Sequence, residues 1–326
     1  MLSRDEAFEL LRRFDGGELA AKELLFDASR DWARERALAH AAEGGQEVAD
    51  AELDALVGHA LESAMSISRS GGYAFTTFLD WWVRKHLANL INPPPASVVA
   101  DQERVAEAIR EAALDATEIS LSGWTDDRAL VRFRVPKKRV PVVWRKLRKL
   151  NERLDIWPIV GDHAVKTASS AVCATLSASA TADLSHFGPL SYEEKADEKW
   201  LLSPVTSPPK KRFVRVPKSA GDLVAITVFP TSRGHEVPAF DPWLERWPPE
   251  KVVALFRRWS EVYGAELCMF GLGGAIELVA KRPPITRADA YALAQEHRVF
   301  NSEIEPPTEA LADRLLADTR WAFWFD

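Results

Sequence analysis

Cysteine is scarce in this sequence: Cys173 and Cys268 are the only two in 326 residues. A disulfide framework needs several cysteine pairs, and a cysteine zinc site needs four ligands at characteristic spacing, so both are excluded. Two thiols in a chain of this length are typical of a reducing compartment. We therefore expect a cytoplasmic protein.

Long apolar runs are also missing, since none approaches the roughly 18 residues that indicate a transmembrane helix. Arg4, Asp5 and Glu6 follow the first three residues directly, and no apolar segment precedes them, so we expect neither a signal peptide nor a membrane partner. An excess of positive charge is absent too, because 42 Lys and Arg stand against 48 Asp and Glu, a net charge of −6. A protein that coats DNA by charge alone is thereby excluded.

No strong enzyme or cofactor motif is present. The Gly-rich segment 271–274 lacks the lysine of a phosphate-binding loop and follows no βαβ pattern, so it predicts a turn. His163 and His235 have no companions at metal-ligand spacing, and lone histidines are usually core or surface residues. Glu266 and Glu277 lie on neighbouring predicted strands, where acids are most often solvated. We therefore expect a protein that is not an enzyme and uses no cofactor and no metal.

The length and the local patterns predict two domains. Residues 1–92 have helical spacing broken at pairs of glycines, and the three prolines at 93–95 end the last helix. Residues 93–115 are then a linker and a helix. Residues 116–326 mix strand and helix patterns, with a hairpin around residues 271–274. The predicted fold is a helical bundle followed by an α+β domain with a mainly antiparallel sheet.

The helix predicted over residues 73–91 carries two adjacent tryptophans. At about 100° per residue, positions 75, 79, 83, 87 and 90 form the core stripe, and Trp81 points nearly opposite. Trp81 must therefore be covered by another element or meet a partner. Aromatic rings beside Arg84 and Lys85 suit unstacked bases, because rings stack on bases and cations contact phosphates. The alternative is that Trp81 and Trp82 fill a helical-bundle core from both sides.

Residues 72–91 resemble the promoter-melting segment in region 2 of bacterial sigma-70-type RNA polymerase sigma factors, and residues 2–25 resemble the start of that family's core-binding region. The agreement lies in the spacing of the glycine, the aromatic residues, the tryptophan pair and the arginine. The resemblance implies core RNA polymerase and promoter DNA as partners. It implies that Tyr73, Phe75 and Phe78 melt and capture the non-template strand, that Trp81 and Trp82 meet the upstream fork, and that Arg84 and Lys85 are the basic residues beside it.

The sequence departs from that family at several positions. Lys85 stands where the family has Gln, which can bond bidentately to an adenine edge, and Phe78 stands in place of Tyr. Val57 and Gly58 occupy the positions of a polar Gln-Glu pair that the family presents to the polymerase. Residues 1–95 hold ten basic and sixteen acidic residues. That balance suits a polymerase-docked domain better than one that binds DNA alone.

The second half has no helix-turn-helix that would read another promoter element. Residues 222–326 instead resemble the bacterial family known as domain of unknown function 4253, which implies no assigned activity. The resemblance is carried by residues 247–250, 256–259, 263–266, 276–279, 282–284, 290–296 and 321–326. We expect a regulatory domain with a protein partner.

A basic stretch lies earlier in this half, where residues 128–153 hold eleven Lys or Arg and Glu152 as the sole acid. A helix predicted over residues 143–154 places Arg145, Lys146, Arg148 and Lys149 on its outer side. Such a face is usually solvated; the alternative is a surface for nucleic acid or an acidic partner.

Two functions are compatible with these patterns. The first is a transcription-related protein whose sigma-like module docks on RNA polymerase or promoter DNA, with the C-terminal domain as sensor or regulator. The second is an immunity- or antitoxin-type protein that binds a protein partner and uses the helices as a scaffold. Burial of all three side chains at Phe78, Trp81 and Lys85 would exclude the first.

Overall fold

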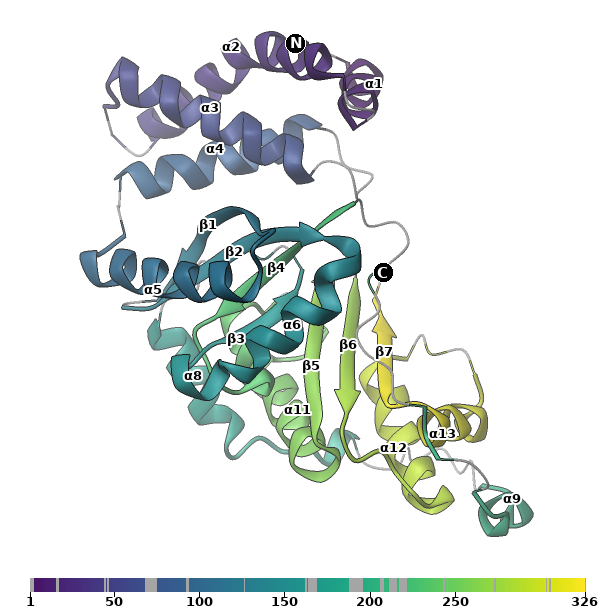
Figure 1. The fold of residues 1–326 in the computed structure, drawn as a ribbon. Helices are drawn as coiled ribbons and strands as arrows, with labels where there is room; N and C mark the ends of the chain where they lie inside the picture. The colour runs from purple at the N-terminus through teal and green to yellow at the C-terminus, as the bar shows by residue number, and fades with distance from the viewer. Residues whose placement is uncertain are drawn as a thin grey trace. The chain divides into compact units, whose positions relative to one another are not determined.

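The computed structural model describes residues 3–15, 18–43, 45, 47–67, 75–91, 94–125, 127–161, 163, 169–187, 196–205, 208–210, 216, 222–242, 244, 246–272, 274–302, 304 and 306–325. The chain divides into two compact units, unit 1 (Met1–Pro94) and unit 2 (Pro95–Asp326). Figure 1 shows the ribbon with its elements labelled. Each unit has a hydrophobic core of its own.

Unit 1 is helical, as predicted, with α1 (Arg4–Asp15), α2 (Leu19–Glu43), α3 (Asp50–Ile67) and α4 (Phe75–Ile91) in its described part. A capping box begins α1: the Ser3 N–H donates to Glu6 Oε2 at 2.8 Å, and the Glu6 N–H donates to Ser3 Oγ at 3.3 Å. Leu25, Leu61 and Leu79 are fully buried where α2, α3 and α4 meet. The buried face of α2 includes Ala21, Ala33, Ala37 and Ala41, whose small side chains let neighbouring helices approach closely.

Unit 2 contains a seven-stranded sheet in its described part. The strands are β1 (Thr117–Trp124), β2 (Ala129–Pro136), β3 (Trp157–Val160), β4 (Leu223–Phe229), β5 (Ala265–Leu272), β6 (Ala275–Ala280) and β7 (Arg320–Trp324). Their order across the sheet is β1-β2-β4-β3-β5-β6-β7, and every neighbouring pair is antiparallel except β3 and β5. The predicted mainly antiparallel α+β architecture is confirmed.

The predicted hairpin is formed by β5 and β6. Gly271 and Gly274 have φ of 80° and 78°, which L side chains rarely adopt. A Cβ on Gly274 would also lie 2.0 Å from the Phe325 carbonyl oxygen, so this turn requires glycine there.

Helices cover both faces of the sheet. The helices in the described part of unit 2 are α5 (Ala96–Ala112), α6 (Val140–Lys149), α7 (Asn151–Leu154), α8 (Ser169–Ser179), α9 (Glu198–Leu202), α10 (Val237–Phe240), α11 (Pro249–Tyr263), α12 (Arg287–Phe300) and α13 (Thr308–Ala317). One core lies between α5, α6 and the sheet, and a larger one lies between α11, α12, α13 and the sheet. Helix α5, in the segment predicted as linker and helix, packs on β2.

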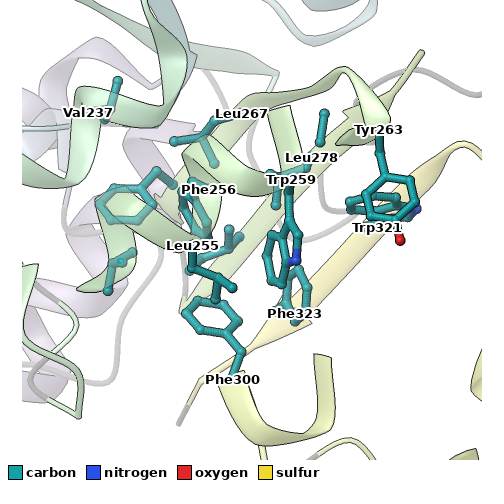
Figure 2. Close-up of a cluster of buried hydrophobic side chains, with 14 of the residues drawn as sticks. Val237, Leu255, Phe256, Trp259, Tyr263, Leu267, Leu278, Phe300, Trp321 and Phe323 are labelled. Atoms are coloured by element: carbon teal, nitrogen blue, oxygen red, sulfur yellow. The ribbon is translucent and has the colours of Figure 1, made fainter. Parts of the chain in front are cut away.

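Aromatic rings dominate the larger core, with Trp259 of α11 at its centre (Figure 2). Its indole stacks on Phe323 of β7, with 5.7 Å between ring centroids and 3° between planes. Phe300 and Trp321 meet the same indole edge-on, at 88° and 85°. The Trp259 Nε1–H donates to Glu296 Oε2 at 2.8 Å, so the buried polar group is paired. These contacts join α11, α12 and β7.

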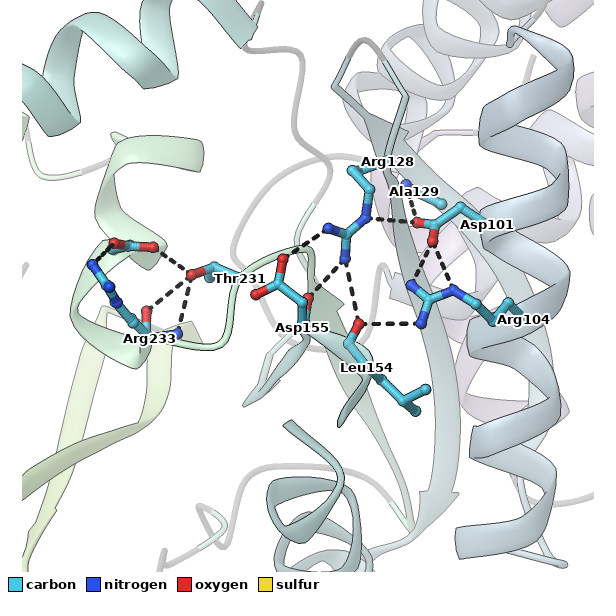
Figure 3. Close-up of polar contacts among 9 residues, drawn as sticks. Asp101, Arg104, Arg128, Ala129, Leu154, Asp155, Thr231 and Arg233 are labelled. Carbon is cyan, nitrogen blue, oxygen red and sulfur yellow. Dashed lines mark hydrogen bonds and ion pairs between the residues drawn. The ribbon is translucent and has the colours of Figure 1, made fainter. Parts of the chain in front are cut away.

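A polar cluster attaches α5 to the sheet (Figure 3). Asp101 accepts the Ala129 N–H at the start of β2 at 2.8 Å and pairs with Arg104 at 2.5 Å and Arg128 at 3.3 Å. Arg128 also pairs with Asp155, which follows α7, at 2.8 Å. Burial would raise the pKa of Asp101, but the Ala129 N–H and the two guanidinium groups lower it.

We expect Trp259→Ala to destabilise unit 2 by about 3–5 kcal/mol, because it removes a buried ring and leaves the Glu296 carboxylate without its indole donor. The urea-unfolding midpoint measures this loss. Trp324→Ala is the matched control, because Trp324 is 53% exposed and its removal is expected to change stability by only about 0.5 kcal/mol. Equal midpoint shifts in the two variants would contradict the central role of Trp259.

Candidate functional site

The tryptophan pair of α4 places one ring inside unit 1 and one at its surface. The two rings meet edge-on, with centroids 4.7 Å apart and planes at 83°. Trp82 is 3% exposed, whereas Trp81 is 42% exposed. Consecutive residues on a helix differ by about 100°, so a helix packed on one side cannot bury both rings equally.

Lys85 lies against both rings. Its Nζ is 4.6 Å from the ring centroid of Trp82 and 5.4 Å from that of Trp81, because residues three and four positions apart share one helix face. The residue is only 6% exposed. The structure therefore places Lys85 in the packing of the pair rather than on an exposed face.

Arg84 is exposed, and its Nε donates to Asp80 Oδ2 one turn earlier, at 3.0 Å. Asp80 Oδ1 also accepts from Arg36 Nε at 2.7 Å and lies 3.1 Å from His40 Nε2, both on α2. Burial would raise the pKa of Asp80, but hydrogen bonds from Arg36, His40 and Arg84 outweigh it and lower the pKa to about 2. An ionised carboxylate thus ties α4 to α2 beside the exposed Trp81.

The other residues predicted to contact DNA are placed differently. Phe75 is 5% exposed and belongs to the core of unit 1. Tyr73 lies outside the described residues, and so does the side chain of Phe78. Leu90, predicted as core, is instead exposed, and Ile91 packs against the core in its place. Of the predicted residues that the structure describes, Trp81 and Arg84 are the exposed ones.

Helix α6 carries the predicted basic face of unit 2. The exposed members are Arg145, Lys146 and Lys149. Arg148 differs, because its guanidinium lies 4.1 Å from the ring centroid of Trp157 and pairs with Glu266 at 2.5 Å. Arg148 therefore joins α6 to β3 and β5, and its charge is neutralised within the fold.

Glu266 and Glu277 are ion-paired rather than solvated. Glu266 meets Lys281 Nζ at 2.7 Å in addition to Arg148. Glu277 of β6 pairs with Arg320 of β7 at 3.3 Å. Each carboxylate thus has cations of its own, which accounts for its low exposure without a catalytic role.

Both histidines singled out in the sequence lie partly or wholly inside unit 2. His163 is buried, with its Nδ1 2.5 Å from Asp241 Oδ2, a partner 78 positions away. Burial, together with Arg257 and Arg233, lowers the pKa of His235 to about 4, so this histidine is neutral at pH 7. Among the described residues, no group of three or more His, Cys, Asp or Glu is placed to hold a metal ion. None of the described helices has the length and apolar character needed to cross a membrane.

A pocket in unit 2 was not predicted from the sequence. It has a volume of about 390 Å³ and lies where α12, α13 and β7 meet Lys210. Its charged members Arg314, Asp318 and Arg320 fall within seven residues that end at the first residue of the aromatic strand β7, which is the signal that the sequence did contain.

We expect Asp80→Asn to destabilise unit 1 by about 1 kcal/mol at pH 7, a modest value because solvent screens the carboxylate. The folded-state pKa is about 2 against an ordinary value of 3.8, so the stabilisation is complete above pH 4 and is lost as the pH falls toward 2. Urea-unfolding midpoints of wild type and variant at pH 7 and pH 2.5 measure this difference.

The matched control for this change is Asp27→Asn, since Asp27 lies on α2 with its side chain 74% exposed. Its midpoint is expected to follow wild type at both pH values. A difference between wild type and Asp80→Asn that stays constant down to pH 2.5 would contradict the assignment to Asp80.

Comparison with known proteins finds a family model that matches part of unit 2. No curated protein and no solved structure matches the chain. The sigma-type resemblance of residues 1–92 stays a prediction. For the C-terminal part the predicted resemblance is confirmed: residues 225–326, which include β5 to β7 and α10 to α13, match the family model described as a domain of unknown function (DUF4253).

Proposed function

We propose that unit 1 is a transcription-related docking module that holds an unpaired base against Trp81 when it is bound to RNA polymerase at a promoter. The observation that carries this proposal is the exposure of Trp81, 42%, on a helix whose other aromatic residues with described side chains, Phe75 and Trp82, are buried. The resemblance of residues 72–91 to the promoter-melting segment of sigma factors supports the choice of partner.

The exposed indole is held in one orientation. Trp82 meets it edge-on and the Lys85 ammonium lies 5.4 Å from its centroid, so little freedom is lost when a base stacks on it. Stacking of one base on such a ring contributes about 1–3 kcal/mol. Arg84, three residues further along the same helix, is exposed and uses its Nε for Asp80, so its remaining N–H groups are the ones offered to a phosphate.

The charge of unit 1 explains why the polymerase belongs in the proposal. Ten basic and sixteen acidic residues in the first 95 repel a DNA backbone, so Trp81 alone cannot provide stable binding. The polymerase supplies the remaining contacts, and unit 2 acts as the regulatory domain.

A second function is favoured by a different observation. Phe75, Trp82 and Lys85 are each 6% exposed or less, so three residues of the sigma-like pattern serve the packing of the bundle. In that case unit 1 is a scaffold, and the protein is an immunity- or antitoxin-type binder of another protein.

Affinity capture of core RNA polymerase by the tagged full-length protein separates the two functions. The wild-type protein is expected to retain the polymerase, and this complex is expected to bind a fork-junction DNA with unpaired bases. Trp81→Ala should weaken fork binding by about five- to hundredfold while polymerase is still captured, because only base stacking is lost.

Trp324→Ala is the matched control, since it removes a similarly exposed indole from unit 2. Trp82→Ala is unsuitable, because Trp82 is buried and its removal disturbs the core. Absence of polymerase from the wild-type eluate, or equal loss of fork binding in both single variants, would contradict the proposal.

A further inference from the structure

The unit 2 pocket has the size of a small-molecule site. Its volume is about 390 Å³, within the usual range for such sites. Residue 210 is fixed at its rim by the backbone, because the Lys210 N–H donates to the Ala317 carbonyl at 2.8 Å and the Lys210 carbonyl accepts from the Thr319 N–H at 3.2 Å. The rim is thereby tied to the end of α13 and the start of β7.

One side of the pocket is apolar. Leu311 and Leu315 of α13 and Trp321 of β7 are all buried and line it. Binding of a ligand whose apolar part covers these side chains gains roughly 25 cal/mol for each Å² of apolar surface removed from water.

The charged residues that line the pocket are three cations, Lys210, Arg314 and Arg320, and one acid, Asp318. Arg320 is paired with Glu277, and its backbone N–H is bonded to Asp318. In contrast, Lys210 and Arg314 are exposed lining residues, and no acid among the described residues lies within ion-pair distance of either. An anionic group would meet two cations there.

Two buried ring nitrogens belong to residues that line the pocket. His297 and Trp321 are each 2% exposed, and neither His297 Nε2 nor Trp321 Nε1 has a hydrogen-bond partner in the described structure. Burial lowers the pKa of His297 to about 3, so its ring is neutral at pH 7. Buried polar groups are nearly always hydrogen-bonded, so two ring nitrogens without partners on residues that line one pocket are an unusual feature of this site.

We propose that this pocket binds a small organic anion with an apolar body, whose charged group lies between Lys210 and Arg314 and whose body lies against Leu315 and Trp321. The combination of two unmatched cations, a buried apolar wall and two unpartnered ring nitrogens fits an amphiphilic anion better than an inorganic ion or a neutral hydrocarbon. The inference concerns unit 2 alone and does not depend on what Trp81 binds.

Two fluorescent probes with the same aromatic framework test whether binding requires a negative charge. They are 8-anilinonaphthalene-1-sulfonate and N-phenyl-1-naphthylamine, which lacks the sulfonate and is neutral. The full-length protein is expected to bind the sulfonate saturably at one site. Lys210→Ala and Arg314→Ala should each weaken that binding about tenfold and leave the affinity for the neutral probe unchanged. Arg153→Ala is the matched control, since Arg153 is an exposed arginine of α7 that does not line the pocket.

Two further measurements locate the probe. Ala317→Phe places a ring in the pocket from an exposed helix-end position and should reduce binding of both probes. The indole N–H resonance of Trp321, assigned with Trp321→Phe, should shift when the sulfonate binds to wild type. Unsaturable binding, equal affinity of wild type for both probes, unchanged sulfonate affinity in Lys210→Ala and Arg314→Ala, or an unmoved Trp321 resonance would overturn the proposal.

Discussion

Burial of the Trp259 indole is the constraint on which unit 2 depends. A buried indole N–H needs an acceptor, and Glu296 of α12 provides it at 2.8 Å. A buried carboxylate in turn needs a cation; burial raises the pKa of Glu296, and Arg258 of α11 opposes this from 2.6 Å. The ring also stacks on Phe323, which fixes β7 beside β6 at the edge of the sheet. One side chain thus sets the relation of two helices to the last strand.

The unit 2 pocket follows from that arrangement. On β7 the alternation of a strand turns Trp321 and Phe323 inward while Ala322 and Trp324 remain exposed. The inward Trp321 brings its ring 5.0 Å from that of His297, and α13 closes the space from the other side. The unpartnered nitrogens therefore arise where the aromatic core ends. A core made only of aliphatic side chains would lack these ring nitrogens.

Much of this fold could be predicted from local sequence patterns, whereas contacts between residues far apart in the sequence could not. Helical spacing identified residues 1–92 as helical, and the glycines at 271–274 located the β5–β6 hairpin. The four-residue β3 is too short to show an alternating pattern, and the Ala, Ser and Thr residues of α8 have weak periodicity, so neither element can be placed from the sequence. Pairs such as Arg148 with Glu266, 118 positions apart, leave no trace in local spacing.

The same difference between local patterns and long-range packing applies to the side chains of α4. A helical wheel placed Trp81 away from the core because angular position depends on sequence alone, and it misplaced Leu90 because packing near the helix end depends on which neighbours are present. It could not show that Lys85 packs against the rings of the pair. The acidic charge of unit 1 repels a phosphate backbone, whereas the exposed indole still offers a flat face on which a base can stack. Under the proposed function, such a surface binds unpaired bases only when another macromolecule presents them, and this is why the proposal combines the exposed ring and the acidic charge of unit 1 with docking on a polymerase.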